Sequence, residues 1–424
     1  MRYRNPIIPG FHPDPSICRV GEDYYLVTSS FEYFPGVPVF HSRDLVHWQQ
    51  IGHCLTRKSQ LPLHGSPSSK GIYAPTLRYH NGRFYMVTTN TTHGGNFFVW
   101  TEDPAGEWSE PVWLDQKGID PSLFFDDDGS VILTTSRNLQ SEIDLASGAI
   151  LSEPKTVWAG SGGHCVEAPH LYRIGDYYYL MAAEGGTGRT HMVTIARSRS
   201  RWGPFENCPH NPILSNRAVG GPICATGHGD LVQAHDGSWW IVFLAIRELP
   251  GDFPRVHILG RETFLLPVDW SEDGWPIVND SGRTRNFDIS APTLPEHTWP
   301  EPDLRDDFRD TSLRLCWNFL RNPHDSDWSL SERSGWLRLH GSPLSLDSLD
   351  TPAFVGRRQR HVNCRVAALL DFAPERDGEE AGLTVLMNEL HHYEVAVIHR
   401  AGLRRVILRR RIGSLSVVEA EQSL

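Results

Sequence analysis

The sequence predicts an all-β protein in which a five-bladed β-propeller is followed by a β-sandwich. Three observations support this fold class. The chain of 424 residues holds 37 glycines and 30 prolines, and 10% of its residues are aromatic, which is typical of short strands joined by tight turns. A short motif recurs five times at the period of a propeller blade. After residue 288 the repeat ends and a different alternating pattern follows.

Each repeat begins with a short motif, passes through a polar turn and enters an aromatic or β-branched strand. The five starts lie 46 to 61 residues apart, which fits blades with inserted loops. They are Asp14-Pro15-Ser16-Ile17, Ala74-Pro75-Thr76-Leu77, Asp120-Pro121-Ser122-Leu123, Ala168-Pro169-His170-Leu171 and Gly229-Asp230-Leu231-Val232. Each repeat is typical of a β-hairpin, so five repeats predict five blades. A sandwich of unrelated hairpins is the alternative.

The sequence pattern predicts two domains joined by a linker. Residues 1–288 carry the repeats and form the predicted catalytic propeller. Residues 289–303 are rich in proline and predict an extended linker. Residues 304–424 alternate again, for example at 335–339, 393–397 and 403–412, and predict a β-sandwich accessory domain.

Several classes of partner are excluded by composition. The net charge of −11 argues against a nucleic-acid surface, and no apolar run is long enough for a membrane span. We see no secretory leader pattern, and the seven scattered cysteines indicate buried thiols in a reducing compartment, so a cytoplasmic location is expected. No glycine-rich phosphate loop is present, so no organic cofactor is expected.

Three acidic residues occupy equivalent places in the repeat. Asp14 and Asp120 stand in the same position, and Glu167 comes one residue before it. Inner strands of a propeller direct equivalent positions towards one channel, so we expect the three carboxyls to converge. Crowded, desolvated acids take divergent pKa values and can divide into acid and base, as glycosidic bond cleavage requires. A purely structural role for each Asp-Pro turn is the alternative.

Longer motifs resemble glycoside hydrolase family 43, and its two-domain β-xylosidase branch in particular. The resemblance covers nearly the whole chain. It is carried by residues 5–16 (NPIIPGFHPDPS), 71–75 (GIYAP), 118–122 (GIDPS), 167–172 (EAPHLY), 184–187 (EGGT) and 227–230 (GHGD). Relatives in this branch often carry Trp where Tyr73 stands. Their C-terminal sandwich is longer than residues 304–424, so the resemblance implies either a truncated protein or a pocket that is more open than usual.

The resemblance implies an inverting mechanism with three carboxyl roles. Asp14 would be the general base that deprotonates the attacking water, and Glu167 would be the general acid. Asp120 would tune the pKa of Glu167 and hold it in place.

The resemblance also implies a sugar-binding wall. Arg261 would bind sugar hydroxyls, while Phe31, Tyr73 and Ala74 would line the substrate. His228 would line the channel, where a water or a structural or activating calcium ion would bind. The acidic stretch at 126–129 (DDDG) lacks the ligand spacing of a calcium loop and predicts a turn.

These expectations point to an exo-acting β-xylosidase that releases xylose from β-1,4-xylo-oligosaccharides. An α-L-arabinofuranosidase, or an enzyme with both activities, is a close alternative, because the two sugars present similar hydroxyl patterns. A non-catalytic carbohydrate-binding propeller is an alternative from another class. A retaining glycosidase on the same scaffold would differ by a shorter carboxyl separation and a covalent intermediate. The sequence leaves the oligomeric state open, a homo-oligomer included.

Overall fold

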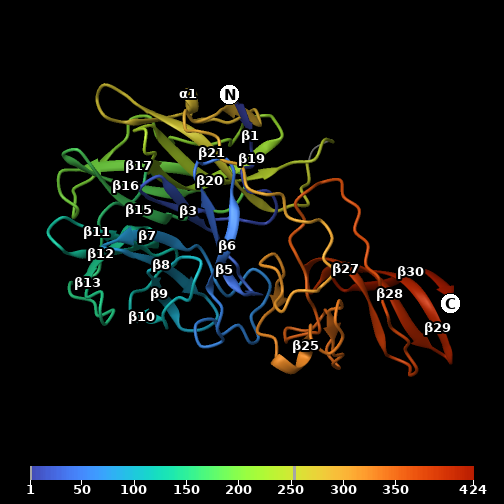
Figure 1. The fold of residues 1–424 in the computed structure, drawn as a ribbon. Helices are drawn as coiled ribbons and strands as arrows, with labels where there is room; N and C mark the ends of the chain where they lie inside the picture. The colour runs from blue at the N-terminus through green and yellow to red at the C-terminus, as the bar shows by residue number, and fades with distance from the viewer. Residues whose placement is uncertain (1, 252–254) are drawn as a thin grey trace. The chain divides into compact units, whose positions relative to one another are not determined.

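The computed structural model describes residues 2–251 and 255–424, and nearly all of its regular structure is antiparallel β-sheet (Figure 1). Five four-stranded sheets, each made of strands in sequence order, form the blades. Blade 1 consists of β2 (Ser16–Val20), β3 (Asp23–Val27), β5 (Gly36–Ser42) and β6 (Gln49–Leu55). Blade 2 consists of β7 (Thr76–His80), β8 (Arg83–Asn90), β9 (Gly95–Thr101) and β10 (Val112–Leu114).

The other three blades follow the same plan. Blade 3 consists of β11 (Ser122–Phe125), β12 (Val131–Thr135), β13 (Leu139–Ile143) and β14 (Lys155–Thr156). Blade 4 consists of β15 (Glu167–Ile174), β16 (Tyr177–Glu184), β17 (Met192–Ser198) and β18 (Glu206–Asn207). Blade 5 consists of β19 (Ile223–Gln233), β20 (Trp239–Arg247), β21 (Arg261–Trp270) and β22 (Pro276–Val278).

The blades close into a ring. The first strand of each blade contacts the first strand of the next, in the order β2, β7, β11, β15, β19 and back to β2. This cyclic contact is the arrangement of a propeller and confirms the predicted fold class. The predicted hairpins are the first two strands of each blade, and the acidic stretch at 126–129 is the turn between β11 and β12.

Blade 5 differs from the repeat in one respect. Its inner strand β19 begins at Ile223, six residues before the repeat start at Gly229, and its register with β20 shifts twice, between Cys224 and Gly227 and between Gly227 and Asp230. Such bulges re-aim side chains. The irregular stretch carries His228 towards the site described below.

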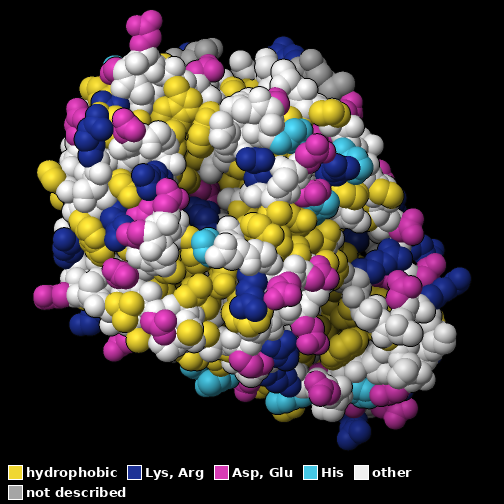
Figure 2. Space-filling view, turned by 60° about the vertical axis from the view of Figure 1, so that its left-hand side comes forward, with side chains coloured by type: hydrophobic (Ala, Val, Ile, Leu, Met, Phe, Trp, Pro, Cys, Tyr) yellow, Lys and Arg dark blue, Asp and Glu magenta, His cyan; other side chains and the backbone are white. Residues whose placement is uncertain are grey.

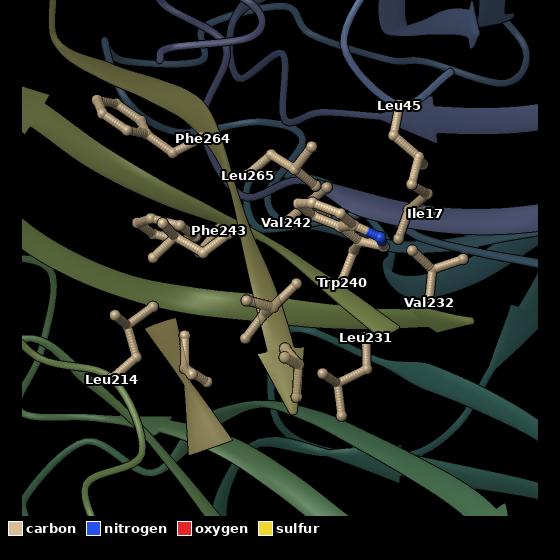
Figure 3. Packing of buried hydrophobic residues seen from close by; sticks show 14 of the residues in the cluster. Ile17, Leu45, Leu214, Leu231, Val232, Trp240, Val242, Phe243, Phe264 and Leu265 are labelled. Carbon is tan, nitrogen blue, oxygen red and sulfur yellow. The ribbon is translucent and has the colours of Figure 1, made fainter. Parts of the chain in front are cut away.

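Apolar side chains from neighbouring blades fill the space between the sheets. The largest cluster of buried residues contains Trp240, Phe243 and Phe264, which lie on β20 and β21 (Figure 3). Leu231 on β19 and Ile17 on β2 belong to the same cluster, so blades 5 and 1 share one core. Burial of this kind supplies most of the driving force for folding.

The two ends of the propeller segment are joined. Strand β1 (Arg2–Arg4) pairs with β23 (Asp288–Ser290), which follows the one-turn helix α1 (Asn279–Gly282). Tyr3 Oη donates to Leu265 O at 2.5 Å, and the Asn5 side chain bonds both the N–H and the carbonyl of Leu265 at 2.9 and 2.8 Å. The N-terminal segment is therefore fastened to the last blade.

The chain after the propeller begins with short, irregular elements. Strand β24 (Phe319–Leu320) pairs with β4 (Tyr33–Phe34), and β25 (Trp328–Ser329) pairs with β26 (Arg338–Leu339). The remaining short elements are the 3-10 turns η1 (Ser136–Asn138) and η2 (Asp325–Asp327). The strand expected at 335–339 is reduced to the two residues of β26. One compact unit comprises Met1–Arg338 together with Val355–Val362.

The second compact unit comprises Leu339–Phe354 and Asn363–Leu424. It contains one four-stranded meander, β27 (Glu380–Asn388), β28 (His391–Arg400), β29 (Leu403–Ile412) and β30 (Leu415–Ser423). The expected strands at 393–397 and 403–412 are confirmed. One face carries a small cluster of Ala396, Ile398 and Ile407, and the other exposes apolar side chains such as Val395.

The seven cysteines are free thiols, and the expectation that all of them are buried is wrong for three. Cys165, Cys316 and Cys364 are exposed because they lie in irregular segments outside the strands. In the described part of the chain, no helix has the length and apolar character needed to span a bilayer. Charged side chains of both signs are interspersed with apolar ones on the face seen in Figure 2.

Candidate active site

Asp14, Asp120 and Glu167 lie at the same end of three inner strands. Asp14 and Asp120 each stand two residues before β2 and β11 begin, and Glu167 is the first residue of β15. Electrostatic interactions link Asp120 to both other carboxyls and link Glu167 to Asp14. The structure thus brings together the three acids that the repeat places in equivalent positions.

The backbone is left-handed at this end of the strands. The φ angle is 56° at Asp14, 53° at Asp120 and 50° at Ala168, which follows Glu167. Each of these residues precedes a proline. Residues other than glycine rarely adopt such angles, and a residue before proline is normally extended. Strain of this kind persists where the surroundings impose it, and it is concentrated at functional sites.

Asp14 is a buried carboxylate with strong partners. Arg261 Nη1 donates to Oδ1 at 2.6 Å, Ser29 Oγ donates to Oδ2 at 2.6 Å, and His228 Nδ1 lies 3.6 Å from Oδ1. Burial raises the pKa of Asp14, but the charge of Arg261, the nearby His228 ring and the hydrogen bond from Ser29 together outweigh it, and the pKa lies below its ordinary value. Asp14 is therefore ionised at neutral pH.

Glu167 and Asp120 are displaced in the opposite direction. Burial and then the charge of Asp14 raise the pKa of the half-buried Glu167, although His164 and Arg261 counteract this. Burial raises the pKa of Asp120 well above its usual range, as do the charges of Glu167 and Asp14. Asp120 also accepts a hydrogen bond from the backbone N–H of Ala168, and so holds the strand beside Glu167.

Aromatic rings and a guanidinium form the wall beside Asp14. The ring of Phe31 stacks on Phe11 with centroids 5.5 Å apart and meets Tyr73 edge-on at 5.8 Å. Arg261 Cζ lies 5.5 Å from the Phe31 centroid and 6.0 Å from that of Phe11. Ala74 is 4% exposed and occupies in blade 2 the repeat position of Asp14, where a methyl group leaves more room than a carboxyl.

Backbone pairing fixes the positions of Phe31 and Tyr73 in this wall. Phe31 and Ile72 exchange backbone hydrogen bonds of 2.8 and 3.1 Å, which places Tyr73 next to Phe31. Gly71 has a φ of 88°, and a Cβ there would lie 2.5 Å from Phe31 O. Only glycine therefore permits this close approach.

Two buried histidines lie beside Asp14. His228 has a φ of 50°, and His191 packs on Gly227, where a Cβ would lie 2.4 Å from the imidazole Cγ. Burial lowers the pKa of His191 to about 3 and also lowers that of His228. Both rings are therefore neutral at physiological pH and present hydrogen-bonding nitrogens, not charges.

The surroundings of His228 bear on the expected calcium ion. Calcium takes six to eight oxygen ligands. Here Asp14 is already paired, and within residues 2–251 and 255–424 no group of three His, Cys, Asp or Glu side chains is arranged to hold a metal. The residues do not fit an ion held by protein ligands, so the calcium site stays a prediction and the chemistry below uses protein groups.

A buried glutamate supports the loop that leads to Glu167. Glu184 accepts hydrogen bonds from Ser161 N at 2.7 Å, Gly163 N at 2.6 Å and Thr194 Oγ1 at 2.6 Å. It thereby anchors residues 161–163 to blade 4. Glu184 is the first residue of the motif at 184–187, and the sequence alone indicates no role for it.

A buried polar network connects the inner strands of the blades. Asp230 accepts from Ser16 Oγ at 2.6 Å, from Tyr172 Oη at 2.6 Å and from Arg78 at 2.8 and 3.1 Å. Arg78 also contacts His170 at 3.0 Å. These residues come from blades 1, 2, 4 and 5, so one buried carboxylate holds four inner strands in register.

Three residues of the site are missing from the sequence prediction: Phe11, Ser29 and His191. Phe11 stands inside the motif around Asp14, so its position alone could have indicated it. Ser29 and His191 lie in no repeat position and no quoted motif, and only the fold brings them to Asp14.

Known proteins are similar to this chain in sequence and in fold. The family model described as "Glycosyl hydrolases family 43" matches residues 3–276, which include the five blades except the end of β22. The chain belongs to glycoside hydrolase family 43. The model "Beta xylosidase C-terminal Concanavalin A-like domain" matches residues 305–423. The family-43 chain is accordingly a glycoside hydrolase, with a propeller and a sandwich-type C-terminal domain, as predicted.

Curated relatives of this family-43 enzyme carry two kinds of name. A "Non-reducing end alpha-L-arabinofuranosidase" from Bacteroides ovatus is 48% identical over 416 residues, covering 96% of this chain and 78% of the relative. A "Xylosidase/arabinosidase" from Butyrivibrio fibrisolvens is 42% identical, covering 93% and 80%. A "Beta-xylosidase" from Bacillus subtilis is 38% identical, covering 96% and 81%.

Solved structures agree in fold. The "Bacteroides ovatus Xyloglucan PUL GH43B" structure has a TM-score of 0.94 at 45% identity, covering 100% of this chain and 85% of that one. The xylan β-1,4-xylosidase from Bacillus halodurans has a TM-score of 0.93 at 36% identity, covering 100% and 84%.

Proposed function

We propose that this enzyme is an inverting, exo-acting β-xylosidase that releases xylose from short β-1,4-xylo-oligosaccharides. One observation carries the proposal. The carboxyls of Asp14 and Glu167 interact electrostatically, and the pKa of Asp14 is lowered while that of Glu167 is raised. An inverting glycosidase needs one ionised carboxylate to activate water and one protonated carboxyl to donate to the leaving group.

The proposed reaction is a single displacement. Asp14 takes a proton from a water molecule, whose oxygen attacks the anomeric carbon. The bond between that carbon and the glycosidic oxygen breaks, and Glu167 donates its proton to the departing oxygen. The sugar leaves with inverted configuration, Asp14 protonated and Glu167 ionised, and proton exchange with solvent restores both.

Neighbouring groups support these two roles. Asp120 accepts a hydrogen bond from the Ala168 N–H beside Glu167. A negative charge on Asp120 raises the pKa of Glu167 and so favours its protonated form. Arg261 binds Asp14 at 2.6 Å and keeps it ionised, and its remaining N–H groups can donate to sugar hydroxyls. Phe31 and Tyr73 offer apolar faces to the C–H surface of the sugar.

A second candidate activity is α-L-arabinofuranosidase, alone or beside the first. The relative that is 48% identical has that name, and another is named for both activities. An apolar wall separates two similar sugars only weakly, whereas hydrogen bonds to hydroxyls separate them well. The arrangement of donors around Arg261 would therefore decide between them.

Three further expectations accompany this proposal. A calcium ion near His228, assembly into a homo-oligomer and a cytoplasmic location each stay predictions. Calcium binding is tested by calorimetry on the full chain against His228→Ala, and assembly by sedimentation.

Kinetics on two aryl glycosides test the proposal. We expect the native chain to hydrolyse the aryl β-xyloside faster than the aryl α-arabinofuranoside. Asp14→Ala should lower both rates by about 10²–10⁴-fold, and Glu167→Ala should lower the hydrolysis of xylobiose by the same factor. Asp127→Ala is the matched control, because its side chain is 83% exposed in a distant turn. A faster arabinofuranoside reaction would favour the second candidate, and a folded but inactive native chain would indicate a carbohydrate-binding propeller.

A further inference from the structure

A short segment of the C-terminal region is part of the propeller's own compact unit. The C-terminal family model begins at residue 305, yet Val355–Val362 cluster with the propeller and not with the second unit. Asn318 and Gly356 exchange backbone hydrogen bonds of 2.7 and 2.8 Å, which ties the segment to the strand that pairs with β4.

Arg358 in this segment reaches the loop that precedes Asp14. Its Nε donates to Phe11 O at 2.7 Å, and its Nη1 donates to Asn318 Oδ1 at 2.7 Å. Gln359 lies close to Gly10, because a Cβ on Gly10 would lie 2.7 Å from Gln359 O. The segment therefore packs directly against the loop containing Gly10 and Phe11.

The electrostatic setting of Arg358 is unfavourable for a cation. Both hydrogen-bond acceptors are uncharged oxygens, and burial lowers the pKa of Arg358 to about 10, although Tyr33 and Glu32 act in the opposite direction. Burial lowers the pKa of His12 well below its ordinary value, and the positive charge of Arg358 lowers it further. A partly buried guanidinium costs free energy in such a place. Its two short hydrogen bonds indicate that it holds backbone geometry.

The loop that Arg358 binds contains Phe11, whose ring is part of the wall beside Asp14. Phe11 stacks on Phe31 at an interplanar angle of 18°. Its other neighbour is Gly260, where a Cβ would lie 2.6 Å from Phe11 Cδ2. Arg261 lies over both rings and donates to Asp14. A shift of Phe11 would therefore move the guanidinium that keeps Asp14 ionised.

We propose that Arg358 is a positioning residue of the active site, which acts through Phe11 to hold Arg261 on Asp14. The proposal deepens the proposed function and rests on its assignment of Asp14 as the base. According to this proposal, the segment Val355–Val362 helps to hold the active site in its geometry.

Arg358→Met in the full chain tests this proposal. A misplacement of about 1 Å can cost about 10²-fold in rate, so we expect kcat/KM on the aryl glycoside to fall by about 10- to 100-fold. The lower limb of the pH profile should move to higher pH, since a loosened Arg261 no longer depresses the pKa of Asp14. Arg358→Lys should recover part of the loss. Arg357→Met is the matched control, because Arg357 is exposed, donates to Leu304 O and lies over the ring of Trp317.

A double-mutant cycle with Phe11→Leu separates positioning from general destabilisation. If Arg358 acts through Phe11, the double variant should lose no more activity than the poorer single variant. Losses that multiply, or a folded Arg358→Met variant with native kcat/KM and a native lower limb, would overturn the proposal. If Arg358→Met does not fold, Arg358→Lys and its cycle with Phe11→Leu decide the question.

A binding measurement tests the role of Arg358 separately from the proposed function. A native chain that hydrolyses neither glycoside would contradict the proposed function. Calorimetric titration with xylose and arabinose would still test the wall, since Arg358→Met should bind the preferred sugar at least tenfold more weakly than Arg357→Met does. Equal affinities would overturn the role of Arg358.

Discussion

Asp14 and Glu167 lie in one cluster of carboxyls, but the pKa of Asp14 is lowered and that of Glu167 is raised. The cause is the partners each residue has. Asp14 receives short hydrogen bonds from Arg261 and Ser29, whereas Glu167 is half-buried and faces the negative charge of Asp14. Burial alone would raise both pKa values, so the donors around Asp14 decide which carboxyl becomes the base.

The role of Glu167 predicts a dependence on the leaving group. Glu167→Gln removes the proton donor, so hydrolysis of xylobiose should fall by about 10²–10⁴-fold. An aryl xyloside whose phenol is a good leaving group needs little protonation and should lose much less. Steady-state kinetics on both substrates measure the difference. Asp14→Asn is the comparison and should impair both substrates alike, and equal losses for Glu167→Gln would contradict its role as the acid.

The hydrogen bond from Ser29 predicts a shift in pH dependence. It lowers the pKa of Asp14, so its removal in Ser29→Ala should raise that pKa. The base must be ionised, and the acidic limb of kcat/KM should therefore move up by about one pH unit. Ser30→Ala is the control, because the buried Ser30 Oγ has no hydrogen-bond partner within the described residues. An unmoved acidic limb in Ser29→Ala would contradict this account.

At the residue scale the sequence predicts the acids better than their partners. Asp14, Asp120 and Glu167 are visible because the repeat places them in equivalent positions. Ser29 is not visible in this way, because its hydrogen bond to Asp14 depends on the fold and leaves no periodic pattern in the sequence. Phe11 is intermediate, since it lies within a recognisable motif but acts through stacking that depends on the position of Phe31.

At the scale of elements, one buried carboxylate joins strands from four blades. Asp230 bonds Ser16, Arg78 and Tyr172, and its side chain is fully buried. Burial raises its pKa, but the charges and hydrogen bonds of its partners, Arg78 first among them, lower it below its ordinary value. The interaction stabilises the fold above the unfolded pKa of about 4 and is lost as pH falls through the lower folded pKa.

This network predicts a large loss of stability in Asp230→Asn. Arg78 would remain buried without its counter-charge, so the free energy of unfolding at pH 7 should fall by about 3–5 kcal/mol. The difference from the native chain should shrink below pH 4. Urea unfolding at several pH values measures both effects. Asp127→Asn, which removes an exposed ion pair, should change stability by less than about 1 kcal/mol. A native unfolding curve for Asp230→Asn would contradict the role of the network.

The hairpins of the blades are predictable because each is local. Their strands alternate over a few residues and are joined by turns such as 126–129. The extension of β19 is not predictable in this way, since its bulged residues before Gly229 are fixed by pairing with β20. The strand expected at 335–339 shortens to β26, whose partner β25 has only two residues.

At the scale of the whole molecule, ring closure creates the site. The inner strand of blade 5 contacts that of blade 1, and β1 pairs with β23 after the last blade. Asp14 and Asp120, which are 106 positions apart in the chain, thereby come close enough to interact electrostatically. The repeat predicts this closure. It does not predict that Val355–Val362 join the propeller's unit, because that depends on contacts between segments of unrelated sequence.

The stereochemistry of the product tests the central claim most directly. Proton NMR of the first turnovers on an aryl β-xyloside resolves the anomers before mutarotation mixes them. The single displacement with Asp14 as base and Glu167 as acid predicts that α-xylose appears first. Initial release of β-xylose would contradict that account and would require a covalent intermediate on the enzyme.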